Sequence, residues 1–213
     1  MIPPDATPPD ATPIDLTAAP REATCLDYAN TRMYRGSAAP VEQFAEWPAL
    51  VDWIAGTGAL VAEAAADLRG WAAADAEGAA ALFASAIALR EVVYRVFSAV
   101  ASGAPVAEAD LAALNQALAE APPRARLARL GGAYVWRIEH AGLSAPALLA
   151  PVLWSAADLL VQAPHRRIRQ CANPQCLWLF IDASKNGTRR WCDMAACGNR
   201  AKAHRHYLRS KQR

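Results

Sequence analysis

Apolar residues recur at helical spacing through most of the first 160 residues. Familiar signals mark the ends of these patterns: a proline in a first turn, a glycine just beyond a last turn, and Ser144 as a cap. The helices predicted in this way cover residues 47–55, 75–102, 108–120 and 144–160. The N-terminal part of the chain is therefore predicted to be mostly α-helical.

Other segments have the patterns of strands or of extended chain. Residues 125–130 and 133–139 flank a Gly-Gly pair, and apolar residues alternate in the second segment, so a β-hairpin is predicted. The short apolar run 24–28, which ends at Asn30-Thr31, predicts a short strand. Residues 1–13 contain Pro-Pro-Asp-Ala-Thr twice and no large side chain to bury, so residues 1–21 are expected to form a disordered arm.

The last 50 residues have a pattern of their own. The β-prone runs 177–181 and 188–191 flank Asn186-Gly187, a pair typical of hairpin turns, and Asp193 is placed to cap a helix that begins at Met194. Residues 164–213 are therefore predicted to form a knuckle, a β-hairpin and a helix.

The composition indicates a protein with a substantial core. Hydrophobic residues make up 54% of 213 residues, yet no stretch approaches the roughly 18 apolar residues of a membrane span. The N-terminus also lacks the pattern of a signal peptide. We therefore expect a cytoplasmic protein with no membrane partner.

The charges are divided between the two parts. Residues 1–164 contain 18 Asp and Glu against 10 Arg, a net charge of −8, whereas residues 165–213 contain 12 Lys and Arg against two Asp, a net charge of +10. The basic part is suited to a polyanion. A solvated basic tail is the simpler alternative.

Four of the five cysteines lie within 27 residues, as two pairs with the same internal spacing. The residues are Cys171, Cys176, Cys192 and Cys197. Such clustering in a non-secreted chain favours a metal over disulfides, and Zn²⁺ suits four thiolates because it is redox-inert and accepts tetrahedral sulfur. An iron–sulfur cluster is the alternative. Four protein ligands leave no open position, so the zinc is expected to be structural. Cys25 stands apart and is expected to be a buried, inert residue.

The predicted last helix carries cations on the face opposite its metal-binding side. Together with the preceding loop, the residues expected to bind nucleic acid are Arg189, Arg190, Arg200, Lys202, Arg205 and Arg209. The same finger could instead present Trp178 and Tyr207 to RNA or to a protein.

Arg90 lies in the middle of an apolar face of the longest predicted helix, so its guanidinium needs an anionic partner. One interpretation is an internal salt bridge to Asp27 or Asp158. Another is an effector pocket, in which Arg90 and Arg35 bind a small anion that Asn30 and Thr31 orient. A third is that Arg90 reaches the surface along its alkyl stem. The tryptophans of this region are expected to pack in the core rather than to line a cavity.

Two families resemble this sequence. The C-terminal segment resembles the CGNR zinc finger through Cys197-Gly198-Asn199-Arg200, the other three cysteines, Trp178-Leu179-Phe180, Asp182, Ser184, Arg189-Arg190-Trp191 and Met194. The upstream region resembles the ABATE domain, described as a stress-induced transcription regulator, through Leu26-Asp27-Tyr28, Asn30-Thr31, the helix around Trp53 and Leu89-Arg90-Glu91. The resemblance implies a bacterial regulator whose finger binds DNA.

We therefore expect an α+β protein: an arm (1–21), a helical ABATE-like sensor or oligomerisation domain with a small β-hairpin (22–163), and a treble-clef-like zinc finger (164–213). Expected partners are Zn²⁺ and DNA, with a small anionic effector and a homodimer as further candidates. Because no nucleophile, acid–base pair or phosphate-binding glycine loop is visible, we do not expect an enzyme.

Overall fold

The computed structural model describes residues 14–18, 23–163 and 167–211; for residues 14, 15, 17, 18, 140, 141 and 204–209 only the backbone is described. The predicted proline-rich segment 1–13 lies outside these residues. Part of the predicted arm is ordered, however, because Ile14–Ala18 form strand β1 and Leu16 is fully buried.

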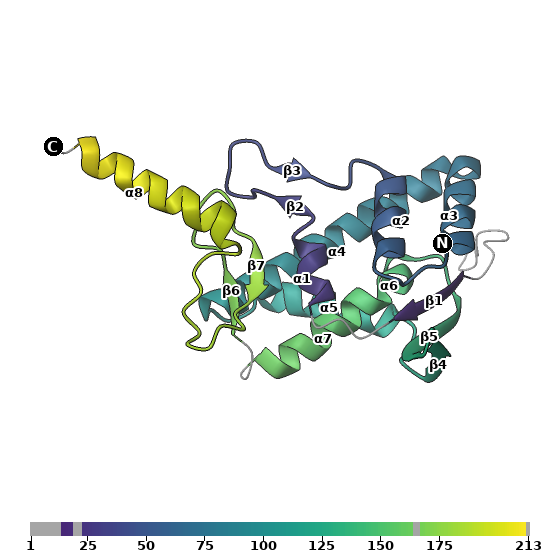
Figure 1. Cartoon of the computed structure of the whole chain (residues 1–213). Coiled ribbons are helices and arrows are strands. Elements are labelled where there is room, and N and C mark those ends of the chain that lie inside the picture. The colour runs from purple at the N-terminus through teal and green to yellow at the C-terminus, as the bar shows by residue number, and fades with distance from the viewer. Residues whose placement is uncertain (1–13, 19–22, 164–166, 212–213) are drawn as a thin grey trace.

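One long helix, α4, runs through the middle of the molecule, and the other elements pack around it (Figure 1). The described helices are α1 (Thr24–Ala29), α2 (Trp47–Gly56), α3 (Ala62–Ala74), α4 (Ala76–Ser102), α5 (Glu108–Glu120), α6 (Ala145–Leu148), α7 (Ala150–Gln162) and α8 (Asn199–Lys211). The Asp75 side chain accepts a hydrogen bond from the backbone of Gly78 and so caps the start of α4, and Gly103 ends the helix in the left-handed conformation. The predictions for α2, α4 and α5 are confirmed.

Three small antiparallel sheets complete the fold. Strands β4 (Arg126–Leu130) and β5 (Ala133–Ala141) form the predicted hairpin, and β1 adds to the other edge of β5. Strands β2 (Arg32–Met33) and β3 (Val41–Glu42) pair after α1, and β6 (Ile168–Gln170) pairs with β7 (Leu179–Ile181). The sheet of β1, β5 and β4 lies at the opposite end of the molecule from α8 (Figure 1).

Some predicted elements of the helical part are wrong. The run 24–28 forms α1 and not a strand, because it packs between α4 and α7 and a short apolar run has no period that separates helix from strand. The predicted helix 144–160 is broken into α6 and α7 near Pro151, which has no backbone N–H to donate. Helix α3 was not predicted, since it is rich in alanine and buries only Ala65 and Leu68.

The finger has the predicted order of knuckle, hairpin and helix, but its hairpin differs from the prediction. Strand β7 pairs with β6, which precedes the knuckle, and not with residues 188–191, which form no strand. The Asn-Gly turn is present, with Gly187 at a φ of 61°. A π-helical turn, Met194–Gly198, comes before α8. The predicted α+β fold, with a mostly helical part followed by a zinc finger, is confirmed.

The finger and the helical part share one hydrophobic core. Ile168 of β6 and Leu179 of β7 belong to the same cluster of buried residues as Phe97 of α4 and Leu26 of α1. The tryptophans of the helical part also pack in or against this cluster, as predicted. A second, small cluster surrounds the cysteines of the finger. Packing therefore fixes the finger against α4 and α1.

No single helix in the described part of the chain is long and apolar enough to cross a membrane. Helices α3 and α4 pass that test only as a pair, with a bend of 120° between them.

Candidate zinc and nucleic-acid site

The four predicted zinc ligands converge on one point. The Sγ atoms of Cys171, Cys176, Cys192 and Cys197 all lie within 4.8 Å of one another. Cys192 Sγ lies 3.6 Å from Cys176 Sγ and 3.8 Å from Cys197 Sγ. Tetrahedral zinc with Zn–S bonds of about 2.3 Å requires sulfur atoms about 3.8 Å apart. The arrangement therefore fits Zn²⁺, and its four thiolates leave no position open for a water or a substrate.

Local backbone structure places each pair of cysteines. Cys171 follows β6 and donates its backbone N–H to Trp178 O at 2.8 Å, which closes the knuckle. Cys176 donates to Asn173 O at 2.9 Å, and the next residue, Leu177, has a φ of 57° that turns the chain back into β7. The knuckle is thus a tight turn inside a hairpin, with both thiols on its inner side.

The second pair depends on the π-helical turn. Asp193 accepts a hydrogen bond from Ala196 N at 2.5 Å, which caps the turn as the sequence predicts. Gly198 N donates to Asp193 O at 3.0 Å, the wider spacing of a π-helix. Cys197 therefore belongs to this wide turn, and the regular helix starts only at Asn199.

The surroundings of the thiols explain why they need a cation. Burial raises the pKa of Cys176 to about 11 and also raises the pKa of Cys192. Burial opposes ionisation of Cys197 as well, but hydrogen bonds from Asn173 and from the neighbouring thiols lower its pKa. Asn173 Nδ2 lies 3.5 Å from Cys197 Sγ and donates a hydrogen bond to this ligand without binding the metal itself. Zinc binding therefore displaces protons from the buried thiols, so its affinity rises with pH.

Asp182 organises the loop between the two pairs of cysteines. Its buried carboxylate accepts hydrogen bonds from Ser184 N at 3.0 Å, Ser184 Oγ at 2.5 Å and Arg189 N at 3.0 Å. The Ser184 hydroxyl and these backbone donors lower the pKa of Asp182. The carboxylate therefore holds the two ends of the loop together at neutral pH.

The predicted nucleic-acid residues fall into three groups. Arg189 is engaged within the finger, because its guanidinium donates to the carbonyls of Trp191 and Cys192 and lies 4.6 Å from the centre of the Phe180 ring. Arg190, Arg200 and Lys202 are exposed. The side chains of Arg205 and Arg209 lie outside the described residues, as does that of Tyr207. The role of all six cations in binding nucleic acid stays a prediction.

Comparisons with known families agree with this geometry. The ABATE family model, described as "Putative stress-induced transcription regulator", matches residues 22–163, well over half of the chain. The chain belongs to the ABATE family. The model of the CGNR zinc finger matches residues 167–210, which include all four cysteines, so the finger binds zinc. A comparison with curated proteins found no match. Neither matching family is an enzyme family.

Two of the predicted effector residues of the ABATE domain, Arg35 and Arg90, form ion pairs with Glu42 and Glu91. Arg90, 1% exposed, donates to both carboxylate oxygens of Glu42, at 2.5 and 2.7 Å, and its Nε donates to Glu91 at 3.0 Å. Arg35 donates to both oxygens of Glu91 at 2.6 and 3.1 Å. Thr31 Oγ1 accepts from Arg90 at 3.3 Å. The predicted internal salt bridge is present.

The network differs from the prediction in its partners. Glu42 and Glu91 pair with Arg90 in place of Asp27 or Asp158, and Asp158 pairs with Arg124 at 2.6 Å. Burial tends to raise the pKa values of Glu42 and Glu91, but their arginine partners outweigh it and lower both. Both carboxylates are therefore charged at neutral pH.

Asn30 has a role that the sequence did not reveal. Its side chain is 2% exposed and pairs with the backbone of Leu179 in the finger: Asn30 Nδ2 donates to Leu179 O at 2.8 Å, and Leu179 N donates to Asn30 Oδ1 at 2.9 Å. The amide therefore acts as a short extra strand on the free edge of β7. Asn30 joins the ABATE domain to the finger.

Tyr94 and Gly36 make further contacts at this seam. Tyr94 of α4 donates its hydroxyl to Leu177 O at 3.2 Å and accepts from Gln170 Nε2 at 3.0 Å. The Arg35 guanidinium lies 3.8 Å from the centre of the Tyr94 ring. Gly36 approaches Pro174 so closely that a Cβ atom there would lie 1.8 Å from Pro174 O. Arg35 of the ion-pair network thus contacts Tyr94, which is itself bonded to the zinc knuckle.

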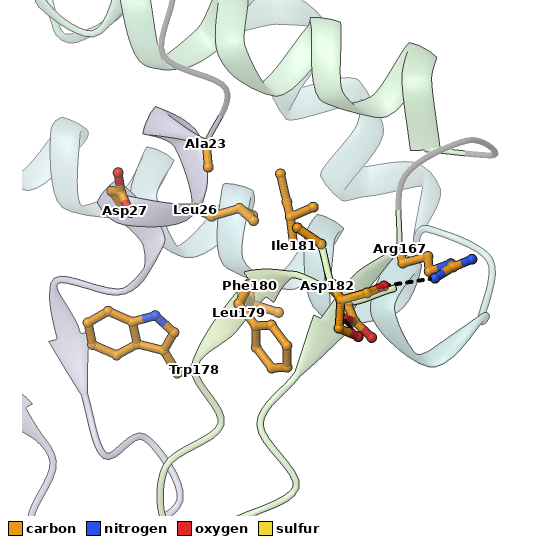
Figure 2. Close-up of a pocket in the computed structure, with 11 residues that line it drawn as sticks. Ala23, Leu26, Asp27, Arg167, Trp178, Leu179, Phe180, Ile181 and Asp182 are labelled. Carbon is orange, nitrogen blue, oxygen red and sulfur yellow. Dashed lines mark hydrogen bonds between the residues drawn. The ribbon is translucent and has the colours of Figure 1, made fainter. Parts of the chain in front are cut away.

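A cavity of about 560 Å³ also lies at the seam, between α1 and β7. Figure 2 shows Leu26 of α1 and Ile181 of β7 on its apolar side, with Trp178 below α1 and Arg167 at the far end. Arg167 Nη1 donates to Ser184 O at 3.4 Å. The half-buried Trp178 therefore faces the seam as well as solvent.

Proposed function

We propose that the protein is a zinc-dependent, DNA-binding transcriptional regulator, in which the finger contacts DNA and the ABATE domain senses a signal or forms the oligomer. The supporting observation is the surface of the finger. Among its described residues, the exposed charged side chains are cationic except for Asp193, since Asp182 is buried within its loop. Such a surface attracts a polyanion.

The position of α8 supports the same proposal. The helix extends away from the rest of the molecule (Figure 1), and its 13 residues make it about 20 Å long. A helix of this length that stands clear of the body is able to enter the major groove of a duplex, which is about 12 Å wide. Arg200 and Lys202 in its first turn are exposed.

The test is a titration of duplex DNA against the full-length, zinc-loaded protein over a range of salt concentrations. The proposal predicts a steep fall in affinity with salt, and loss of binding on chelation. Lys202→Gln should reduce the salt slope by about 1. Arg129→Gln is the matched control, because it removes one exposed charge from β4 at the opposite end of the molecule (Figure 1) and should leave the slope unchanged.

Selection from random genomic fragments then tests sequence specificity. Enrichment of a common duplex site supports a regulator, whereas failure to enrich any duplex contradicts the proposal. Binding of single-stranded RNA or of a protein in preference to duplex would favour the alternative, in which Trp178 and Tyr207 make the contacts.

For the sensor role, Glu42 is the most exposed member of the ion-pair network. Its side chain is 37% exposed, whereas those of Arg90 and Arg35 are 1% and 8% exposed. A small anionic effector would therefore have to displace Glu42 from Arg90, next to Thr31, whereas the amide of Asn30 is already bonded to Leu179. Calorimetric titration of small carboxylates and phosphates into the wild type and into Glu42→Gln tests this. The variant should bind such an anion more tightly, and equal or absent binding in both proteins would count against the effector.

A further inference from the structure

Two adjoining cavities lie on the finger, separate from the cavity between α1 and β7. The first, of about 430 Å³, lies between the knuckle, Trp191 and the first turn of α8. The second, of about 390 Å³, lies between the C-terminal end of α4 and the loop 187–190. Ala172 and Arg190 line both cavities, so the two form neighbouring compartments of one site. Each has the size of a small-molecule pocket.

The first compartment offers flat surfaces and positive charge. Trp191 forms one wall, and the Arg190 guanidinium lies 5.5 Å from the centre of its ring. Arg200 lines the same compartment from α8 and lies 5.8 Å from the ring of Tyr34 in the ABATE domain. The amide side chains of Asn173 and Gln175 provide donors and acceptors. Aromatic rings and guanidinium planes are the surfaces on which nucleobases stack in proteins.

The second compartment suits a phosphate group. Arg169, Arg189 and Arg190 line it, together with the hydroxyl-bearing residues Ser102 and Thr188. No carboxylate lines either compartment among the residues that the structure describes. Arginine and hydroxyl groups are the side chains that bind phosphate oxygens, and the charged residues that line this compartment are all cationic.

We propose that these compartments form a nucleotide-binding site, with the base against Trp191 and the phosphate between Arg190 and Arg169. The recognised chemistry is a planar base joined to a phosphate, supplied either by a free nucleotide or by an unstacked nucleotide of a strand. Only the second source rests on the proposed function. Tyr34 of the ABATE domain lies beside Arg200, so that domain also borders the site.

The first experiment is calorimetric titration of the full-length, zinc-loaded protein with adenosine 5′-monophosphate, with adenosine and with ribose 5-phosphate. The nucleotide should bind roughly tenfold or more tightly than either half, because stacking and charge-assisted hydrogen bonds each contribute a factor of that order. Arg200→Gln and Arg190→Gln should each weaken nucleotide binding about tenfold. Arg129→Gln on β4 should leave it unchanged.

Trp191 packs against the cysteine cluster, so its replacement risks loss of the finger. Arg200→Gln is therefore the deciding variant, and its zinc content should equal that of the wild type. If the nucleotide and ribose 5-phosphate bind equally, and Arg200→Gln weakens neither, the surface attracts phosphate without a base site and the proposal is overturned.

A second experiment separates the two sources of nucleotide. A duplex with one unpaired, extrahelical base is compared with a fully paired duplex of the same length. Tighter binding of the bulged duplex, lost in Arg200→Gln, supports the strand-borne ligand. Nucleotide binding without any duplex binding supports the site and contradicts the proposed function. If the protein binds duplex but neither binds the nucleotide nor prefers the bulged duplex, the proposed function is supported and the nucleotide site is contradicted.

Discussion

The seam between the ABATE domain and the finger makes a sharp prediction for Asn30→Ala. The substitution removes both hydrogen bonds to Leu179 and leaves a buried N–H and a buried C=O without partners. Each such group costs about 1–3 kcal/mol, so the free energy of unfolding should fall by about 2–4 kcal/mol. For a chain of this size the melting temperature should drop by roughly 5–15 °C.

Asn30→Asp tests the direction of each hydrogen bond. The new carboxyl group can still accept from Leu179 N, but when ionised it faces Leu179 O without a proton to donate. Burial and the facing carbonyl should raise its pKa in the folded protein above the value of about 3.9 in the unfolded chain. The stability that depends on its proton is then present below pH 4 and lost as the pH rises through the folded pKa. This variant should be nearly normal in acid and destabilised at neutral pH, relative to the wild type at each pH.

The assay is urea unfolding followed by circular dichroism, with zinc content measured on each protein. Asn115→Ala is the matched control, because Asn115 is exposed on α5 and its loss should change the stability by less than about 0.5 kcal/mol. If Asn30→Ala is as stable as this control, the amide does not hold β7 and the finger is not fixed to the ABATE domain in the way described.

Three further predictions concern the seam, the ion pairs and the metal. Gly36→Ala should cost about 1–3 kcal/mol in urea unfolding, because its Cβ would meet Pro174 O, whereas Gly56→Ala, with no atom within 4 Å of the new methyl group, should be neutral or stabilising. Arg90→Met should cost about 1–2 kcal/mol at neutral pH by the same method, since Glu42 loses its partner but is partly exposed and stays in contact with water. Arg90 outweighs the effect of burial and lowers the pKa of Glu42, so the stability of the wild type should fall as the pH drops below about 4.5. Arg90→Met should lose less stability over that range. The same acid profile in both proteins would contradict the pairing of Arg90 with Glu42. Chelation of zinc should lower the melting temperature of the helical core as well as unfold the finger, as followed by tryptophan fluorescence and circular dichroism, whereas an unaltered core transition would show that the two parts unfold independently.

Elements with local end signals could be predicted from the sequence. The predicted starts and ends of α4 and α5 agree with the structure to within a residue, because caps, glycine and proline act on neighbouring backbone groups. The zinc ligands could also be predicted from local sequence. Four cysteines within 27 residues, in two pairs of equal spacing, can reach one metal ion without help from distant segments.

Contacts between distant segments could not be predicted in this way. The need of Arg90 for an anion followed from its apolar face, but its main partner, Glu42, is 48 residues away on a two-residue strand with no distinctive pattern. Asn30 pairs with Leu179 across 149 residues, and an asparagine after an apolar run looks like a turn residue in isolation. The pairing of β7 with β6 was missed because the Asn-Gly signal favoured the nearer segment.

The shared core limits how this zinc finger could be moved into another protein. Many zinc fingers can be cut from one protein and joined to another through a flexible linker. Here Ile168 and Leu179 would lose their apolar neighbours, and Leu179 its hydrogen-bond partner Asn30. A chimera that transplants this finger alone would carry an exposed hydrophobic patch and an unpaired strand edge. A graft would also have to carry the matching surface of α1 and α4, so the smallest unit of this protein that could be exchanged is larger than its zinc-binding segment.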